Sequence, residues 1–352
     1  MADAVRRAIR EHGPLTFAQY MELALYGRGG FYGRSPVGVG GDFLTSPHTH
    51  PVFGELLGRA LRELWEALGR PEPMRIAEVG AGDGTLARQL LAWFRDIPVS
   101  YVAVEVDATA RQALAEIDGV SLATELPEGR HLVLANELLD NLPFRVLRGE
   151  NEVRIGLDGD RLVASEVAID DGLAALVVDI PKGQTGDVVV PVGALAFVDR
   201  LAATLSPAGY ALLIDYGDAG PSGSVHGYRG HRIVADVLAA PGSTDITAGV
   251  DFGSLATRAR DGGLQAFPLV TQHGALMALG LEAWLRDELS RQHGELDARE
   301  GAAAVRTWSG RSRATSLADP GGLGRFRWWL LATPGLPAPA WHRDAAELDA
   351  RG

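Results

Sequence analysis

The most constraining feature of this sequence is a short apolar strand that runs into a glycine-rich loop and then into a helix, between residues 75 and 95. In such a unit the loop brings backbone atoms close to a ligand, and the free N–H groups of the helix N-terminus face it. Strands and helices alternate afterwards, with strands expected at 101–105, 132–135 and 210–215 and helices at 108–117 and 193–205. This alternation predicts an α/β fold, in which helices cover both faces of a Rossmann-like parallel sheet.

The spacing of the glycines in Glu78-Val79-Gly80-Ala81-Gly82-Asp83-Gly84-Thr85 separates two kinds of ligand. Dinucleotide sites use G-x-G-x-x-G, whereas this loop reads G-x-G-x-G and has Thr85 where the third dinucleotide glycine would stand. An acidic residue also lies two positions before the first glycine. The loop therefore favours S-adenosyl-L-methionine (SAM) over NAD, and a glycine turn without any ligand is the remaining interpretation.

Glu105 is expected at the end of the next strand, where a carboxylate accepts both hydroxyls of a ribose. Asp107 is the nearby alternative for this role. SAM and NAD enzymes both place an acid here, so this residue supports a nucleoside ligand without separating the two cofactors.

Polar residues follow the strand at 132–135, in Asn136-Glu137-Leu138-Leu139-Asp140. Ligands of open α/β sheets lie beyond the carboxyl ends of the strands, so Glu137 and Asp140 are the candidate catalytic carboxylates. They would hold a guanidinium or ammonium group and accept its proton. Helix capping by Asp140 or Asn136 is the alternative. Asp215 and Tyr216 follow the strand at 210–215 and are candidates for substrate contact, with an N-cap as the alternative.

The segment Gly40-Gly41-Asp42-Phe43-Leu44-Thr45-Ser46-Pro47 combines glycines, an aromatic ring and two hydroxyls outside any regular element. We interpret it as a loop that covers a ligand, with a plain solvent loop as the alternative.

Composition narrows the function classes. Lys and Arg number 33 against 45 Asp and Glu, which gives a net charge of −12 without a basic cluster, so nucleic-acid binding is not expected. There is no cysteine, and the nine histidines have no metal-ligand spacing, so we predict no disulfide and no metal site. With no apolar run of about 18 residues and no signal-peptide pattern, we expect no membrane span and a cytoplasmic location. Small molecules or basic protein segments are the expected partners, and a homodimer is among the assemblies the sequence allows.

The organisation predicted along the chain has four parts. Residues 1–72 are expected to form a helical and loop extension that covers the cofactor site. Residues 73–143 and 191–352 form the two halves of the core, and residues 144–190, with short β-like runs separated by turns, form a β-rich insertion between them. A second, helical insertion is expected near 273–310, and a last strand at 325–332.

These elements, in this order, resemble the MidA-like family of SAM-dependent methyltransferases, which includes a mitochondrial complex I assembly factor that is a protein arginine methyltransferase. The resemblance extends from about Gly13 to Leu330. It rests on Gly13-Pro14-Leu15-Thr16, Gly41 to Pro47, Glu78 to Leu86, Ala135 to Pro143, Asp215-Tyr216-Gly217, Arg229-Gly230-His231-Arg232 and Asp245-Ile246-Thr247.

The resemblance implies a SAM-dependent methyltransferase that releases S-adenosyl-L-homocysteine and methylates a protein arginine. A small-molecule O- or N-methyltransferase on the same fold, and a SAM-binding assembly factor without methyl transfer, remain alternatives. The expected cofactor-binding residues are Gly41, Asp42, Phe43, Thr45, Ser46, Glu78, Gly80, Gly82, Gly84, Thr85, Leu86, Glu105 and Asn136. The expected substrate-binding residues are Asp215, Tyr216 and His48.

Four positions depart from the family pattern. His48 stands where the family commonly has an acid, and Asp83 and Ala81 replace the arginine and proline of its glycine loop. Asn141 replaces an alanine. Because the glycines are intact, these departures concern the substrate side more than the cofactor.

Overall fold

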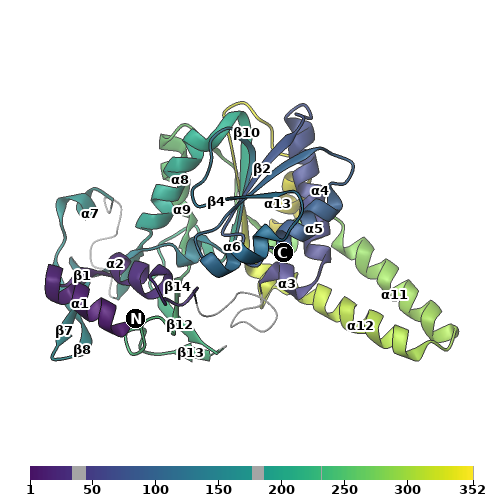
Figure 1. Cartoon of the computed structure of the whole chain (residues 1–352). Coiled ribbons are helices and arrows are strands. Elements are labelled where there is room, and N and C mark those ends of the chain that lie inside the picture. The colour runs from purple at the N-terminus through teal and green to yellow at the C-terminus, as the bar shows by residue number, and fades with distance from the viewer. Residues whose placement is uncertain (34–44, 177–185, 231, 352) are drawn as a thin grey trace.

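The structure is a computed structural model, and it describes residues 1–33, 45–176, 186–230 and 232–351. An eight-stranded sheet forms its centre (Figure 1). The strand order is β16 (Gln265–Ala266), β18 (Arg327–Ala332), β10 (Leu205–Asp215), β5 (Arg130–Asn136), β2 (Met74–Val79), β3 (Val99–Val104) and β4 (Val120–Ala123), and β17 (Val270–Thr271) also pairs with β18.

The strands from β10 to β4 run parallel, whereas β18 lies antiparallel to β10. The chain passes from β2 outward through β3 to β4 and then returns to place β5 on the other side of β2. The strand order therefore reverses between β2 and β5. In sheets of this kind the ligand site lies at the carboxyl edge of that point.

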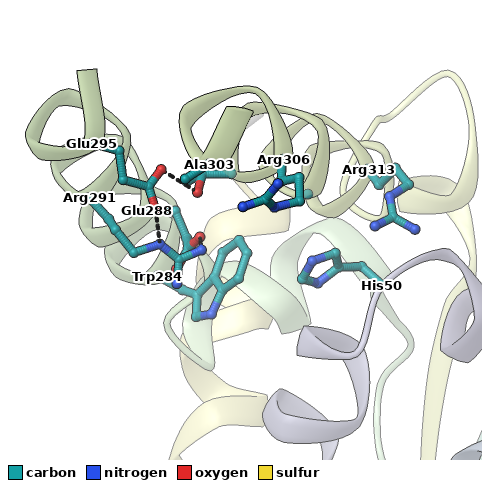
Figure 2. A pocket seen from close by; sticks show the side chains of 10 residues that line it. His50, Trp284, Glu288, Arg291, Glu295, Ala303, Arg306 and Arg313 are labelled. Carbon is teal, nitrogen blue, oxygen red and sulfur yellow. Dashed lines mark hydrogen bonds and ion pairs between the residues drawn. The ribbon is translucent and has the colours of Figure 1, made fainter. Parts of the chain in front are cut away.

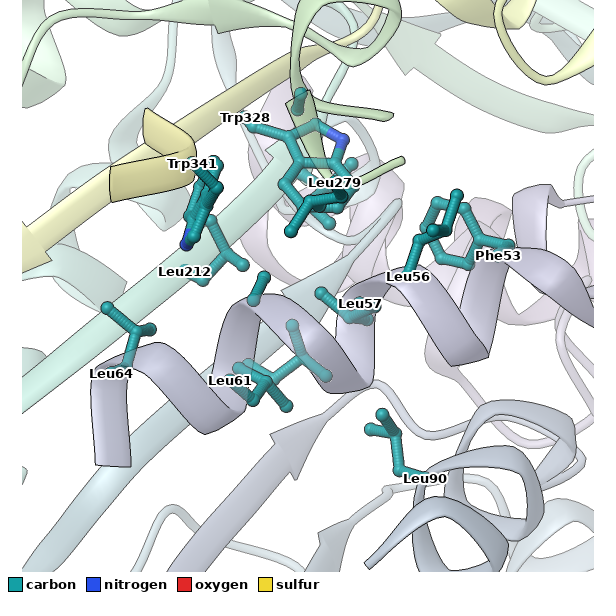
Figure 3. Close-up of a cluster of buried hydrophobic side chains, with 14 of the residues drawn as sticks. Phe53, Leu56, Leu57, Leu61, Leu64, Leu90, Leu212, Leu279, Trp328 and Trp341 are labelled. Atoms are coloured by element: carbon teal, nitrogen blue, oxygen red, sulfur yellow. The ribbon is translucent and has the colours of Figure 1, made fainter. Parts of the chain in front are cut away.

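Helices cover both faces of the sheet (Figure 1). One face carries α4 (Val52–Ala67), α5 (Thr85–Trp93), α10 (Gln272–Ala278) and α13 (Ala340–Asp349), and the other carries α8 (Val192–Thr204) and α9 (Phe252–Asp261). The apolar stripe of α4 explains its position, because Leu57, Leu61 and Leu64 recur at helical spacing and pack toward Leu212 and Trp341 (Figure 3). Each such buried leucine contributes about 1.5–3 kcal/mol of hydrophobic stabilisation.

The N-terminal segment packs on a second, antiparallel sheet. Helix α1 (Ala2–His12), strand β1 (Leu15–Thr16), helix α2 (Phe17–Met21) and the π-helical turn η1 (Glu22–Tyr26) lie against β6 (Arg145–Arg148), β7 (Asn151–Asp158), β8 (Arg161–Ala168) and β9 (Asp187–Val190). A capping box between Thr16 and Gln19 starts α2. The Tyr20 hydroxyl donates to the Val237 carbonyl at 2.7 Å, which ties this segment to the second half of the chain.

The remaining strands and helices border this frame. A three-stranded sheet contains β12 (Val225–Arg229), β13 (Arg232–Val234) and β14 (Asp245–Ala248), and β11 (Gly217–Asp218) pairs with β15 (Val250–Asp251). Two long helices, α11 (Leu281–Asp297) and α12 (Gly301–Ser316), form a hairpin that projects from the body beside the short helix α3 (Ser46–Thr49) (Figure 1). The other α-helices of the described residues are α6 (Ala108–Ala115) and α7 (Asp171–Leu176). No described helix is both long and apolar enough to span a bilayer.

The predicted fold class, including the N-terminal helices and the antiparallel insertion, is confirmed. The helical region expected at 273–310 is divided into three helices. Gly280 adopts a left-handed φ of 101° between the first two, and residues 298–300 turn the chain between the last two. The sequence analysis did not predict α9 or α13, whose residues pack on opposite faces of the sheet.

Candidate functional site

The glycine loop connects β2 to α5 and has an unusual backbone. Gly80, Gly82 and Gly84 have φ values of 72°, 54° and 77°, which lie in the left-handed region that disfavours other residues. A Cβ on Gly84 would come within 2.4 Å of Ile117 Cδ1, so a larger residue there would also have to displace the end of this side chain. The loop therefore presents bare backbone at the N-terminus of α5, which begins at Thr85 and continues with the buried Leu86.

Glu105 lies directly against this loop. Its Oε2 accepts the Gly82 amide at 3.0 Å, and its Oε1 accepts the amides of Val106 and Asp107 at 2.7 and 2.9 Å. Asp107, the alternative for this role, instead caps α6 by accepting the amides of Thr109 and Ala110. The structure thus places Glu105 and the glycine loop together at the carboxyl ends of β2 and β3.

Glu78 is a buried carboxyl group just before the loop. The Tyr101 hydroxyl donates to its Oε2 at 2.6 Å. Burial raises the pKa of Glu78 to about 8, and this hydrogen bond opposes the rise. The group therefore links β2 to β3 beneath the loop.

Thr45 and helix α3 contact both the glycine loop, through Asp83, and the candidate catalytic residue Glu137. The His48 ring lies 3.0 Å from Asp83 Oδ2 through Nε2 and 2.7 Å from Thr45 Oγ1 through Nδ1. Burial raises the pKa of Asp83, but hydrogen bonds from His48 and Thr85 outweigh it and leave the pKa below its usual value. Two of the departures from the family pattern, His48 and Asp83, are therefore partners. The expected residues Gly41, Asp42 and Phe43 lie outside the described residues.

Glu137 follows β5 in a strained backbone conformation, with a φ of 55°. Its Oε1 accepts the Ser46 amide at 2.8 Å and the Asn136 side-chain amide at 3.2 Å. Burial raises the pKa of Glu137 to about 7 despite these two donors. The Oε1 atom is thus held in place from two sides.

Asp140 and Asp215 lie near Glu137, and these three carboxyl groups together are called the acidic group below. The backbone amides of Leu139, Asp140 and Tyr216 donate to Asp215, which is fully buried and so fixes the turn that carries Asp140. The Thr247 hydroxyl donates to Asp140 Oδ2 at 2.6 Å and lies 2.5 Å from the Tyr216 hydroxyl. Burial raises the pKa of both aspartates, and for Asp215 the charge of Asp140 adds to the rise.

Two acceptor atoms in or beside the acidic group have no hydrogen-bond partner among the described residues. They are Asp140 Oδ1 and Asn136 Oδ1, and both are buried. Buried polar atoms normally have partners, so an unpartnered pair at a strand end indicates a place where a ligand donates hydrogen bonds.

Asp245, Asn141 and two tyrosines, none of which was predicted as a site residue, lie next to the acidic group. Asp245 Oδ1 accepts the Tyr32 hydroxyl at 3.2 Å and the Asn141 side-chain amide at 3.0 Å, and the Tyr26 hydroxyl donates to the Asn141 carbonyl at 3.0 Å. Burial raises the pKa of Asp245 to about 7. Asp245 and Thr247 belong to the family motif Asp245-Ile246-Thr247, which could have indicated a role in the site. Nothing in the sequence indicated the two tyrosines.

The residues present fit SAM. Bare left-handed glycines allow close approach to backbone, Glu105 Oε2 accepts one amide and can accept a further hydroxyl, and Asn136 keeps a free acceptor.

Comparison with known proteins identifies the family. Residues 56–270, more than half of the chain, match a family described as "Putative S-adenosyl-L-methionine-dependent methyltransferase". "Protein arginine methyltransferase NDUFAF7, mitochondrial" of Danio rerio is 30% identical, over 82% of this chain and 80% of its own length. The chain belongs to the MidA-like family of SAM-dependent methyltransferases. The Homo sapiens protein of the same name is 28% identical over 81% of this chain and 74% of its own.

The crystal structure of "a COG1565 superfamily member and likely methyl transferase" supports the same conclusion. A Burkholderia thailandensis protein bound to S-adenosyl-homocysteine matches this chain with a TM-score of 0.80 and 25% identity, over 97% of this chain and 93% of its own. This MidA-like protein is therefore a SAM-dependent methyltransferase, and its product from the cofactor is S-adenosyl-L-homocysteine.

Proposed function

We propose that this enzyme methylates an arginine side chain of a protein, and that Glu137 and Asp140 hold the guanidinium group. The observation that carries the proposal is the convergence of Glu137, Asp140 and Asp215 at the carboxyl ends of β5 and β10, with a buried acceptor of Asp140 unpartnered among the described residues. A planar cation with several N–H donors suits such a group of carboxylates. The two relatives named as protein arginine methyltransferases support the same acceptor.

We further propose that the cofactor occupies the carboxyl edge of β2 and β5. Gly80, Gly82 and Gly84 would lie along it, Glu105 would accept its ribose hydroxyls, and Asn136 would contact its methionine part. Thr45 and Ser46 would border the same space from the start of α3. When bound, SAM supplies a methyl group on a sulfonium centre, which a nitrogen nucleophile attacks.

The protein's own contribution is orientation, desolvation and proton acceptance. Glu137 and Asp140 would align a guanidinium nitrogen with the methyl group and restrict the motion of the guanidinium before the reaction. As the nitrogen forms a bond to the methyl carbon, the bond between that carbon and sulfur breaks, sulfur keeps the electron pair to give S-adenosyl-L-homocysteine, and the nitrogen releases a proton. Glu137 would accept that proton, because its pKa of about 7 suits proton exchange at neutral pH. Tyr216 and Thr247 would keep Asp140 in position through their hydroxyls.

Transfer of a labelled methyl group tests the proposal. The enzyme is incubated with radiolabelled SAM and lysate from cells that lack the protein, and the products are hydrolysed to amino acids. We expect label in methylated arginine from a discrete protein band. Label confined to the small-molecule fraction would favour the alternative acceptor class, and cofactor binding without any S-adenosyl-L-homocysteine release would indicate an assembly factor.

A further inference from the structure

A cavity separate from the acidic group opens at the base of the α11–α12 hairpin. It has a volume of about 540 Å³ and is lined by His50, Trp284, three arginines and two glutamates, among others. His50 follows α3 directly, and its ring lies 5.0 Å from that of Trp284 in an edge-to-face arrangement. Figure 2 shows Arg306 and Arg313 on α12, directed into the same space as these two rings.

The charges in this cavity are not balanced. Arg291 forms ion pairs with both glutamates, Glu288 and Glu295, and the Thr307 hydroxyl also donates to Glu295 at 2.7 Å. Both acids are therefore engaged. Arg306 and Arg313 form no ion pair with any residue in the described ranges, which leaves two free guanidinium groups in a chain of net charge −12.

An aromatic wall beside two free arginines is suited to bind a carboxylate. Arginine pairs with carboxylates in a bidentate manner, and partial enclosure strengthens such charge-assisted hydrogen bonds. The cavity also lies close to the proposed acceptor site. Ser46, whose amide binds Glu137, and His50 are separated by about one turn of α3, or about 6 Å along its axis. An extended peptide covers about 3.3–3.6 Å per residue, so about two residues match the rise between Ser46 and His50, and the side chains on either side add the length of a few residues more.

We propose that this cavity binds glutamate or aspartate side chains of the protein that is methylated, at positions a few residues from the target arginine. The inference rests on the proposed function in that it takes the acceptor to be a protein. The substrate would thus be held by opposite charges at two points: its arginine in the acidic group of Glu137 and Asp140, and its acidic residues at Arg306 and Arg313.

The test measures peptide binding without turnover. Two short fluorescent peptides each contain one arginine, and glutamates in the first are replaced by glutamines in the second. Fluorescence anisotropy follows their binding to the full chain saturated with S-adenosyl-L-homocysteine. The cavity variant is R306Q/R313Q. The control variant is R286Q/R299Q, which removes the same charge from exposed positions of the hairpin outside the cavity lining.

We expect the glutamate peptide to bind at least roughly tenfold more tightly than the glutamine peptide, and R306Q/R313Q alone to abolish that preference. If both variants weaken binding of the glutamate peptide equally, the effect comes from the overall electrostatic field of the protein and the proposal is overturned. A wild-type protein that binds both peptides equally well would also overturn it. Free glutamate that binds as tightly as the acidic peptide would show that the ligand is a small anion, which also overturns it. Cavity-dependent peptide binding without arginine methylation would support the acidic-peptide site and refute the proposed function.

Discussion

The substitution Glu137→Gln separates the chemical role of this side chain from its structural role. Glutamine has the same shape, and its Oε1 retains both donors that hold the glutamate, the Ser46 amide at 2.8 Å and the Asn136 amide at 3.2 Å. It also tolerates the φ of 55° no worse than glutamate does. The change therefore replaces only the second carboxylate oxygen by an NH₂ group, which repels a guanidinium donor and accepts no proton.

The expected loss combines these two effects. One charge-assisted hydrogen bond is worth about 1.5–3 kcal/mol, which corresponds to roughly 10- to 150-fold in rate. Loss of proton acceptance contributes about 10²–10⁴-fold. Because the two effects overlap on one group, we expect a fall in kcat/KM of at least about 10²-fold.

Methyl transfer is measured with radiolabelled SAM, and S-adenosyl-L-homocysteine affinity by calorimetry serves as the control. Affinity for the product should stay within about threefold of wild type, since the glycine loop and Glu105 are untouched. Turnover close to the wild-type rate would refute the assignment of Glu137, whereas a parallel loss of cofactor affinity would show that the substitution disturbs the pocket instead.

Three further predictions test the surrounding geometry. Gly84→Ala should lower the free energy of unfolding by at least about 1–2 kcal/mol in urea titrations, because its φ is 77° and the new Cβ would meet Ile117 at 2.4 Å; an unchanged midpoint would contradict this. The folded-state pKa of Glu78, about 8, exceeds its unfolded value near 4.5, so its contribution to stability is complete below pH 4.5 and is lost as the pH rises through 8. Glu78→Gln should accordingly flatten the stability profile between those pH values, and an unaltered slope would count against it. Alanine at His48 and at Asp83 should show a coupling energy of at least about 0.5 kcal/mol in a double-mutant cycle of unfolding, whereas strict additivity would mean that their 3.0 Å contact contributes nothing.

The parts of the site that sequence predicts are those encoded locally. The glycine loop, Glu105 and the Asn136–Asp140 segment each come directly after a strand, and the carboxyl ends of parallel strands share one edge of the sheet. Their meeting at the switch point of the sheet could therefore be expected from the alternation of strands and helices alone.

The parts that sequence does not predict depend on pairing between distant side chains. Asp215 was expected to contact substrate or to cap a helix, and sequence did not indicate that it accepts the amides of Leu139 and Asp140, which follow another strand. His48 and Asp83 were two separate departures from a family pattern, and only the structure joins them. Such polar contacts have no periodicity, because they are set by how the completed fold brings loops together.

The group of polar side chains around Asp140 has a consequence for biosynthesis. Its Tyr32–Asp245 hydrogen bond joins residues 213 positions apart. At about 5–20 residues per second, a ribosome needs about 10–40 s to make the intervening chain. The strands that carry the glycine loop and Glu105 are synthesised well before Asp245 and Thr247. The nascent chain therefore acquires the glycine loop and Glu105 first, and the contacts that Asp245 and Thr247 make with Tyr32 and Asp140 form last.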